Sequence, residues 1–290
     1  MRTMAKKPAA VPATRPSAPP PAVQDPKRFR RFGNITAQDM EIPALRILHA
    51  LSNVVKKNPE LEPGHFYHSI LEEDLGDQLD VVVLLVHHSV ALKTPKDPRG
   101  KEFPQTLARA ADAKNWEKPN QRFEVTLPGN RKVEYFTDRN VDASGLLEWG
   151  SSDPSDRNSL PAAQHVYTTI MRIIDPHIEG PVIYSGSVMT NKKIMQLNTK
   201  IDLRAAGGIE PLRQIYRLTS EEKTGTQGGN WFIPNFTSAG QLAEDDPRFE
   251  EFLAQAERLQ ALYPTIKIIG NEDIVDADDL SLAGASNAAF

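Results

Sequence analysis

The chain has 290 residues, a formal net charge of −4 and no cysteine, and it is long enough for one large core or two small ones. The lack of thiols excludes disulfides, thiolate zinc sites and a cysteine nucleophile. The longest apolar run, Val81 to Val86, is far shorter than the ~20 residues of a membrane span, so we expect a cytoplasmic protein with no membrane partner.

The two ends of the chain carry opposite charge. Residues 1–31 hold eight Lys or Arg and one acid, and residues 1–26 hold seven of the 23 prolines. From Asn271 onward there are five acids and no cation, so the ends carry +7 and −5 and leave −6 for the residues between them. This composition predicts a disordered Pro-rich basic arm over 1–32, a single domain over 33–269 and a flexible acidic tail over 270–290.

Both ends are candidate binding segments. The arm ends in a cluster of basic and aromatic residues, which are Arg28, Phe29, Arg30 and Arg31, followed by Phe32. The tail offers four aspartates and a terminal aromatic residue, Asp273, Asp276, Asp278, Asp279 and Phe290. Such a tail suits either competition with phosphates for a basic groove or docking of a partner protein, and the alternative is a terminus that only aids solubility.

The body between these ends reads mainly as strands. Val81 to Val86 is a β-branched apolar run typical of a buried strand, and Gln164 to Ile174 predicts a second long strand. Two hairpins are expected. The first runs through Phe123–Leu127, the turn Pro128-Gly129-Asn130 and Val133–Phe136, and the second pairs Arg213–Thr219 with Asn230–Phe236.

Helices are fewer. Ile194, Leu197 and Ile201 share one helical face, with Thr190 as a candidate cap. A second helix is expected after Asp245-Asp246, with Pro247 in its first turn, an apolar stripe from Phe249 to Leu259 and Pro264 at its end. Residues 105–115 predict a short helix. The whole pattern indicates an α+β, β-rich protein, built as a curved antiparallel sheet or an OB-like barrel with a few peripheral helices.

No motif commits the chain to catalysis. The stretch from Gly225 to Gly229 lacks the Gly-Lys-Ser/Thr and the following helix of a phosphate loop, and a hairpin turn is the better interpretation. The adjacent His87 and His88 point to opposite faces of a strand, so at most one of them joins any one metal site. We therefore expect no enzyme, no catalytic residue, no cofactor and no metal.

Candidate nucleic-acid contacts pair cations with aromatic rings, because single-strand binders need both. In the body these are Trp116, which lies in a polar segment between two lysines, Lys132, Tyr135 and Arg139 on the first hairpin, and Tyr216, Arg217 and Trp231 on the second. The competing interpretation is packing, since aromatic residues favour strands and about half of those on an alternating strand belong to the core.

Several stretches resemble a widespread group of bacteriophage early proteins described as single-stranded DNA-binding. The segment from Ile42 to Ser52 is similar to the group's Pro-x-Leu-x-Leu-x-x-x-Leu-Ser opening, with Ile47 in place of the second Leu. Further similar stretches together extend over about residues 40–240, namely Pro63–Tyr67 leading to Leu79–Val83, Gly180–Ile183 followed by Thr190-Asn191-Lys192-Lys193, and Tyr216–Leu218 with Trp231–Phe236.

The resemblance implies an OB-like core, cooperative coating of single strands by a homo-oligomer, and no enzymatic activity. It adds Lys192 and Lys193 to the expected DNA contacts and implies a host-cytoplasmic protein of phage replication or recombination, whose tail docks partner proteins. The tail departs from the group because the uncharged stretch from Leu280 to Ala289 separates Phe290 from the last acid. A structural or adaptor protein, such as a virion component, and a metal-dependent nuclease stay open as alternatives.

Overall fold

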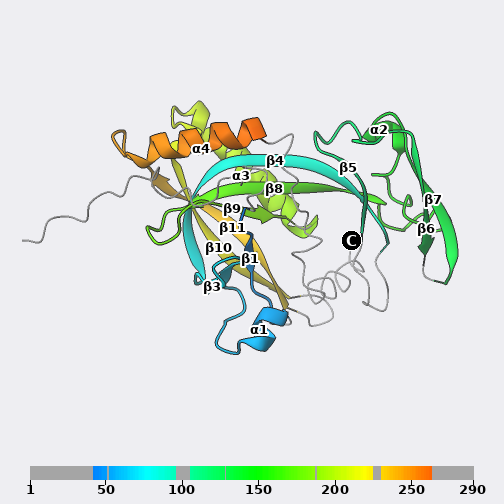
Figure 1. Ribbon diagram of the computed structural model, residues 1–290, viewed down its shortest axis with the longest axis horizontal. Coiled ribbons are helices and arrows are strands. Elements are labelled where there is room, and N and C mark those ends of the chain that lie inside the picture. The colour runs from blue at the N-terminus through cyan, green and yellow to red at the C-terminus, as the bar shows by residue number, and fades with distance from the viewer. Residues whose placement is uncertain are drawn as a thin grey trace, which may run out of the picture. The chain divides into compact units, whose positions relative to one another are not determined.

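The computed structural model describes residues 42–50, 52–95, 105–127, 129–186, 188–224 and 230–262, all of which belong to one compact unit that begins at Glu41. Its centre is an antiparallel sheet in the order β11-β10-β4-β8-β9 (Figure 1). These strands are β4 (Gln78–Lys93), β8 (Ala163–Ile173), β9 (Pro181–Ser185), β10 (Gln214–Thr224) and β11 (Asn230–Gln241). A further strand, β5 (Thr106–Ala110), pairs with the end of β4.

One helix covers each face of this sheet. The 19-residue α3 (Val188–Ala206) turns Ile194, Leu197 and Ile201 onto one face, where they pack with Val81 and Met171. The 15-residue α4 (Arg248–Leu262) turns Phe249, Phe252 and Leu259 onto the opposite face, where they pack with Val82 and Ile170. Alternation along β4 and β8 explains both cores, because successive side chains of a strand point to opposite faces.

A small sheet lies against the α3 side of the core. It has the order β1-β2-β3, from β1 (Leu45–Ile47), β2 (Phe66–His68) and β3 (Glu73–Asp74). The helix α1 (Asn53–Lys57) is part of the connection between β1 and β2. Leu45, Ile47 and Phe66 join the core that α3 covers. Gly64, at φ +92°, permits a close approach here, since a Cβ at this position would lie 2.8 Å from the ring of Phe232.

The far half of β4 belongs to a separate core. The hairpin of β6 (Gln121–Leu127) and β7 (Arg131–Thr137), the one-turn α2 (Val141–Ser144) and β5 enclose it (Figure 1). Val90 and Leu92 of β4 pack there with Trp116, Val125 and Tyr135. The strands β4 and β8 therefore contribute to cores at both of their ends.

Most expected elements are confirmed, including both hairpins, the two long strands and both long helices. Two details were wrong. Residues 106–110 form the strand β5, because they complete the end of β4, and Thr190 lies inside α3, which begins two residues earlier. The described strands form open sheets with β9 and β11 at the edges of the largest one, so the curved sheet is confirmed and no closed barrel is present among these strands. None of the described helices combines the length and apolarity that crossing a bilayer requires.

Candidate nucleic-acid interface

Three of the predicted aromatic contacts are buried. Trp116, Tyr135 and Tyr216 are 4 %, 1 % and 0 % exposed, so their rings offer no face to a base. The expectation that Trp116 is exposed because its neighbours are polar was wrong, since its ring fills the core under the β6–β7 hairpin. The hydroxyl of Tyr216 donates to Gln214 Oε1 at 2.5 Å, inside the core. Trp231 is partly buried, near the free end of the β10–β11 hairpin.

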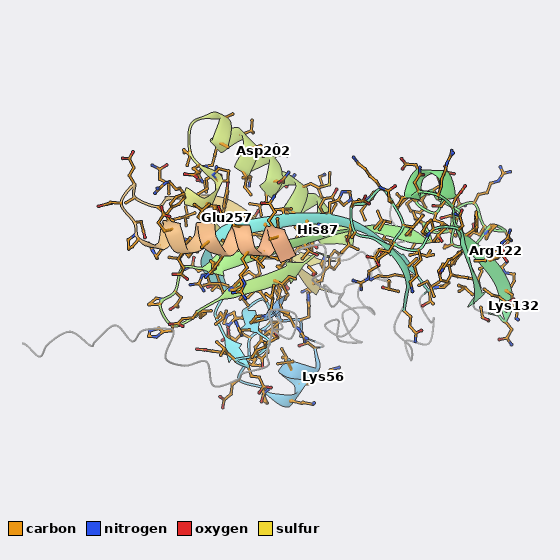
Figure 2. All side chains as sticks on the ribbon, turned by 45° about the horizontal axis from the view of Figure 1, so that its top comes forward. Lys56, His87, Arg122, Lys132, Asp202 and Glu257 are labelled. Atoms are coloured by element: carbon orange, nitrogen blue, oxygen red, sulfur yellow. The ribbon has the colours of Figure 1, made fainter. Side chains whose placement is uncertain are left out.

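Several predicted cations are already paired with carboxylates. Arg217 forms a bidentate pair with Asp80 at 2.9 and 3.0 Å, Lys132 contacts Glu124 at 2.5 Å, and Lys193 contacts Glu221 at 3.2 Å. Figure 2 shows Arg122 and Lys132 on the β6–β7 hairpin, where Arg122 also pairs, with Glu134. The Arg217 and Lys132 pairs are exposed and weak, and the Lys193 pair is partly buried, but each places a negative charge where a phosphate would have to approach.

Two predicted cations stay available. Arg139, which follows β7, and Lys192, in the first turns of α3, are exposed, and neither forms an ion pair with any residue that the structure describes. The remaining predicted contacts lie outside the described residues, namely Arg28, Phe29, Arg30 and Arg31 of the arm and Asp273, Asp276, Asp278, Asp279 and Phe290 of the tail.

The most exposed of the described aromatic residues was not predicted. Trp149 is 65 % exposed and lies in the loop after α2. The backbone of Arg157 packs against Gly150, the residue that follows Trp149. A Cβ on Gly150 would lie 3.3 Å from the Arg157 Cα. The arginine side chain is exposed as well. A ring and a cation therefore lie in one solvent-facing loop, and the signal in the sequence was a tryptophan directly before the turn-rich stretch Gly150–Pro154.

This loop is held in place by buried and polar contacts. The amide of Gly150 donates to the Ser159 carbonyl at 2.7 Å, and the hydroxyl of Tyr135 donates to the Ser152 carbonyl at 2.8 Å. Burial, and to a lesser degree the charge of Asp153, raises the pKa of Tyr135 to about 12, so the hydroxyl keeps its proton at neutral pH. Arg131 of β7 binds Asp153. Tyr135 therefore acts as a support for the Trp149 loop.

A second group of rings lies on the α3 face of β4 and β8. His88 stacks on Tyr167 with ring centroids 4.3 Å apart and planes 1° apart, and its Nε2 lies 2.9 Å from Nδ1 of His165. Burial and the neighbouring His165 lower the pKa of His88, so this ring is neutral at pH 7. The mutual stacking already occupies one face each of His88 and Tyr167, which leaves the exposed His165 as the ring best placed to meet a ligand.

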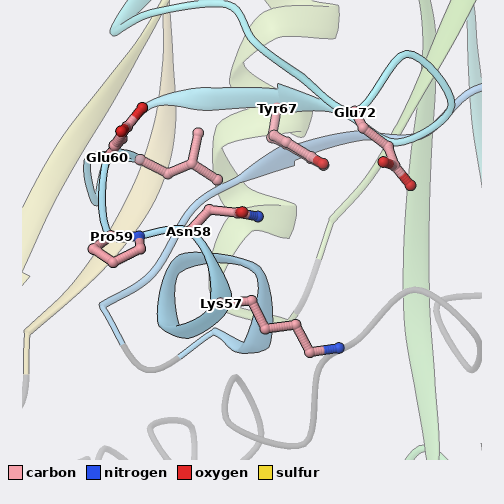
Figure 3. Close-up of a pocket in the computed structure, with 7 residues that line it drawn as sticks. Lys57, Asn58, Pro59, Glu60, Tyr67 and Glu72 are labelled. Atoms are coloured by element: carbon pink, nitrogen blue, oxygen red, sulfur yellow. The ribbon is translucent and has the colours of Figure 1, made fainter.

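A pocket of about 460 Å³ opens between α1 and the small sheet (Figure 3). Lys57, Glu60, Tyr67 and Glu72 line it, so its charged groups have mixed sign with an excess of acid. Burial and the nearby Glu72 raise the pKa of Tyr67. This lining suits neither a phosphate chain nor an apolar ligand. In the part of the chain that the structure describes, no three His, Asp or Glu side chains are grouped to hold a metal ion.

One comparison with known proteins gives a match. The model of a family described as Pam3 phage gp34-like protein matches residues 13–262 of the chain. No curated protein and no solved structure matches.

Proposed function

The chain belongs to the Pam3 phage gp34-like protein family, and we propose that it binds single-stranded DNA without sequence preference in phage replication or recombination. In this role it acts in the host cytoplasm without catalysis or a cofactor. Its acidic tail competes with DNA for the binding surface or docks partner proteins.

The exposure of Trp149 is the observation that carries this proposal. A tryptophan that is 65 % exposed leaves apolar ring surface in water, and a base that stacks on such a ring contributes roughly 1–3 kcal/mol. Arg157 in the same loop supplies a cation for the neighbouring phosphate. Stacking needs no particular base, because every base has a π face, so binding is expected to be tolerant of sequence.

Phosphate contacts supply the rest of the affinity. The body carries −6 between its charged ends, so the arm, at +7, is the main source of positive charge. Counterion release then makes the affinity fall steeply as salt rises. The exposed Arg139 and Lys192 add cations on the body itself.

We expect the protein to bind labelled oligo-dT more tightly than a duplex of equal length, with affinity that weakens steeply between low and high salt. Fluorescence polarisation at several salt concentrations measures both.

Replacing Trp149 by alanine should weaken binding about fivefold or more, because about 1 kcal/mol or more of stacking is lost. Replacing Arg157 by alanine should weaken binding and reduce the salt dependence.

The chain offers matched controls for both variants. Leu203 on α3 is 69 % exposed, so Leu203→Ala removes a similarly exposed apolar side chain far from the Trp149 loop in sequence. Arg258 is exposed on α4, so Arg258→Ala removes one cation from another surface. Equal losses in test and control variants would refute the assignment of the loop, and equal affinity for single strand and duplex would refute the function.

Deleting residues 271–290 should strengthen single-strand binding severalfold at low salt, because five carboxylates no longer compete with phosphates for the cationic surface. The difference should shrink as salt rises, since screening weakens both interactions. Titration of the full chain and the truncated chain with the same oligonucleotide measures this. Unchanged affinity would contradict competition and leave partner docking as the role of the tail.

A structural or adaptor role is the second candidate, and the pairing of cations on both hairpins favours it. A surface whose lysines and arginines already contact carboxylates, with one exposed tryptophan, also suits a protein partner, since tryptophan is frequent at the centres of such interfaces. Stable assembly without DNA, together with no binding of oligo-dT, would support this role over the first.

A further inference from the structure

Two histidines from neighbouring strands of the central sheet direct ring nitrogens toward each other. Nε2 of His88 on β4 lies 2.9 Å from Nδ1 of His165 on β8. In the register of these strands His88 is opposite Tyr167 and His165 is opposite Val90, so both histidines lie on one face of the sheet. Figure 2 labels His87, the residue before His88 on β4. No short spacing in the sequence indicates this pair, because its members are 77 positions apart.

Both histidines are held in place by contacts that do not involve a ligand. The ring of His88 stacks on Tyr167 with centroids 4.3 Å apart. The backbone carbonyl of His165 accepts a hydrogen bond at 2.7 Å from Nδ2 of Asn191, a residue of α3 that is 9 % exposed. The ladder between β4 and β8 continues without a register shift from Leu85 to Leu92. The pair is therefore preorganised, and the exposed ring of His165 keeps it accessible to solvent.

The distance between the two nitrogens fits two ligands of one metal ion. Imidazole nitrogens bind first-row transition ions at roughly 2.0–2.1 Å. Two such nitrogens at a right angle around the ion lie about 2.9 Å apart, whereas at the tetrahedral angle they lie about 3.3 Å apart. The observed 2.9 Å matches the tetragonal geometry of Cu(II) or Ni(II) better than the tetrahedral geometry of Zn(II).

We propose that His88 and His165 bind a divalent transition-metal ion, Cu(II) in preference to Ni(II) or Zn(II), through Nε2 and Nδ1. Cu(II) is preferred because a given set of nitrogen ligands binds it most tightly among the divalent first-row ions. The chain has no cysteine, so no thiolate competes for the ion. Water fills the other coordination positions, since no third His, Asp or Glu among the described residues is grouped with the pair.

The ion binds to the neutral pair by a change of tautomer and without loss of a proton. In its absence one ring donates its N–H to the lone pair of the other. With the ion bound, the proton of His88 is on Nδ1 and that of His165 is on Nε2, so each neutral ring directs a lone pair at the metal. Burial, and next the neighbouring His165, lower the pKa of His88, which keeps this ring neutral at pH 7.

The site lies where the two cores along β4 and β8 meet. Tyr167 packs against the core that α3 covers, whereas Val90 and Ala163 belong to the core beside the β6–β7 hairpin. Because one ligand comes from each strand, a bound ion cross-links β4 and β8 between these cores. The free energy of metal binding then stabilises the pairing of the two strands.

Titration of the full chain with copper(II) chloride at pH 7 tests this site. We expect the electron paramagnetic resonance spectrum of the tightest bound ion to be that of tetragonal Cu(II) coupled to two ring nitrogens. His165→Gln and His88→Gln should each weaken this binding about tenfold or more, because loss of even an outer partner of a metal ligand has an effect of that size. Each variant should also remove the coupling to one nitrogen. Unchanged affinity and coupling in both variants would overturn the proposal.

His177→Gln is the matched control, because His177 is an exposed histidine in the loop after β8. It should leave the affinity and the spectrum unchanged, and an equal loss in this variant would refute the assignment to the cross-strand pair. His165 is exposed, so His165→Gln should keep the fold and decides the outcome even if His88→Gln disturbs the stack on Tyr167. None of these readouts involves DNA, so they stand apart from the proposed function.

Discussion

Replacing Arg172 by methionine is expected to lower the free energy of unfolding by about 3 kcal/mol. Arg172 lies on β8 beneath α4 and is 8 % exposed. Its Nη1 donates to the Gly180 carbonyl at 2.6 Å, and its Nη2 contacts Glu251 of α4 at 3.2 Å. The guanidinium also lies 5.6 Å from the ring centroid of Phe252. Methionine fills much of the space but leaves the carbonyl without its charged donor. Urea unfolding of both proteins measures the difference.

Glu251→Gln is the matched control for this variant. The side chain of Glu251 is 52 % exposed, so water replaces its partner, and the expected loss is below about 1 kcal/mol. The two variants thus separate the buried bonds of Arg172 from its ion pair. Similar losses in both would mean that the ion pair dominates, and no loss in Arg172→Met would mean that apolar packing replaces the buried charge without cost.

Lowering the pH from about 6.5 to about 4 should cost the fold up to about 3 kcal/mol through His87 alone. Burial, and next the neighbouring His88, lower the pKa of His87 to about 4, and a hydrogen bond with the backbone of Ala111 opposes the shift. Above pH 6.5 the ring is neutral in both states and costs nothing. Below it the unfolded chain takes up the proton first, so stability falls until the folded form also protonates near pH 4.

His87→Asn isolates this contribution, because asparagine does not titrate in this range. The buried rings of His49 and His68 have lowered pKa values too, and they titrate in both proteins. The difference in unfolding free energy between the original chain and the variant should therefore shrink as the pH falls from 7 to 4. Chemical unfolding at a series of pH values measures it. A constant difference would show that His87 is not protected from protonation in the folded state.

The strands were predictable because their side chains alternate, whereas exposure of single side chains was not. The first hairpin runs as expected, yet its Tyr135 points inward under the Trp149 loop and its Phe136 outward, with Arg122 5.3 Å from the ring centroid. Alternation shows that adjacent residues differ in direction, but which one is buried depends on the β4 end that the hairpin covers. The helix predicted over residues 105–115 was wrong for a related reason. Residues 106–110 are extended because they pair with β4, which is distant in the sequence.

The length of β4 has a consequence for how the cores at its two ends behave. Its 16 residues begin under α3 and α4 and end beside Trp116, and β8 pairs with it along most of that length. Because β4 and β8 contribute to the cores at both of their ends, neither end can unfold while the other end keeps a complete set of strands. The same pair of strands therefore supports the core beneath the Trp149 loop at one end and the two helices at the other. Ordering of one end reduces the conformational entropy that the chain still loses when the other end becomes ordered.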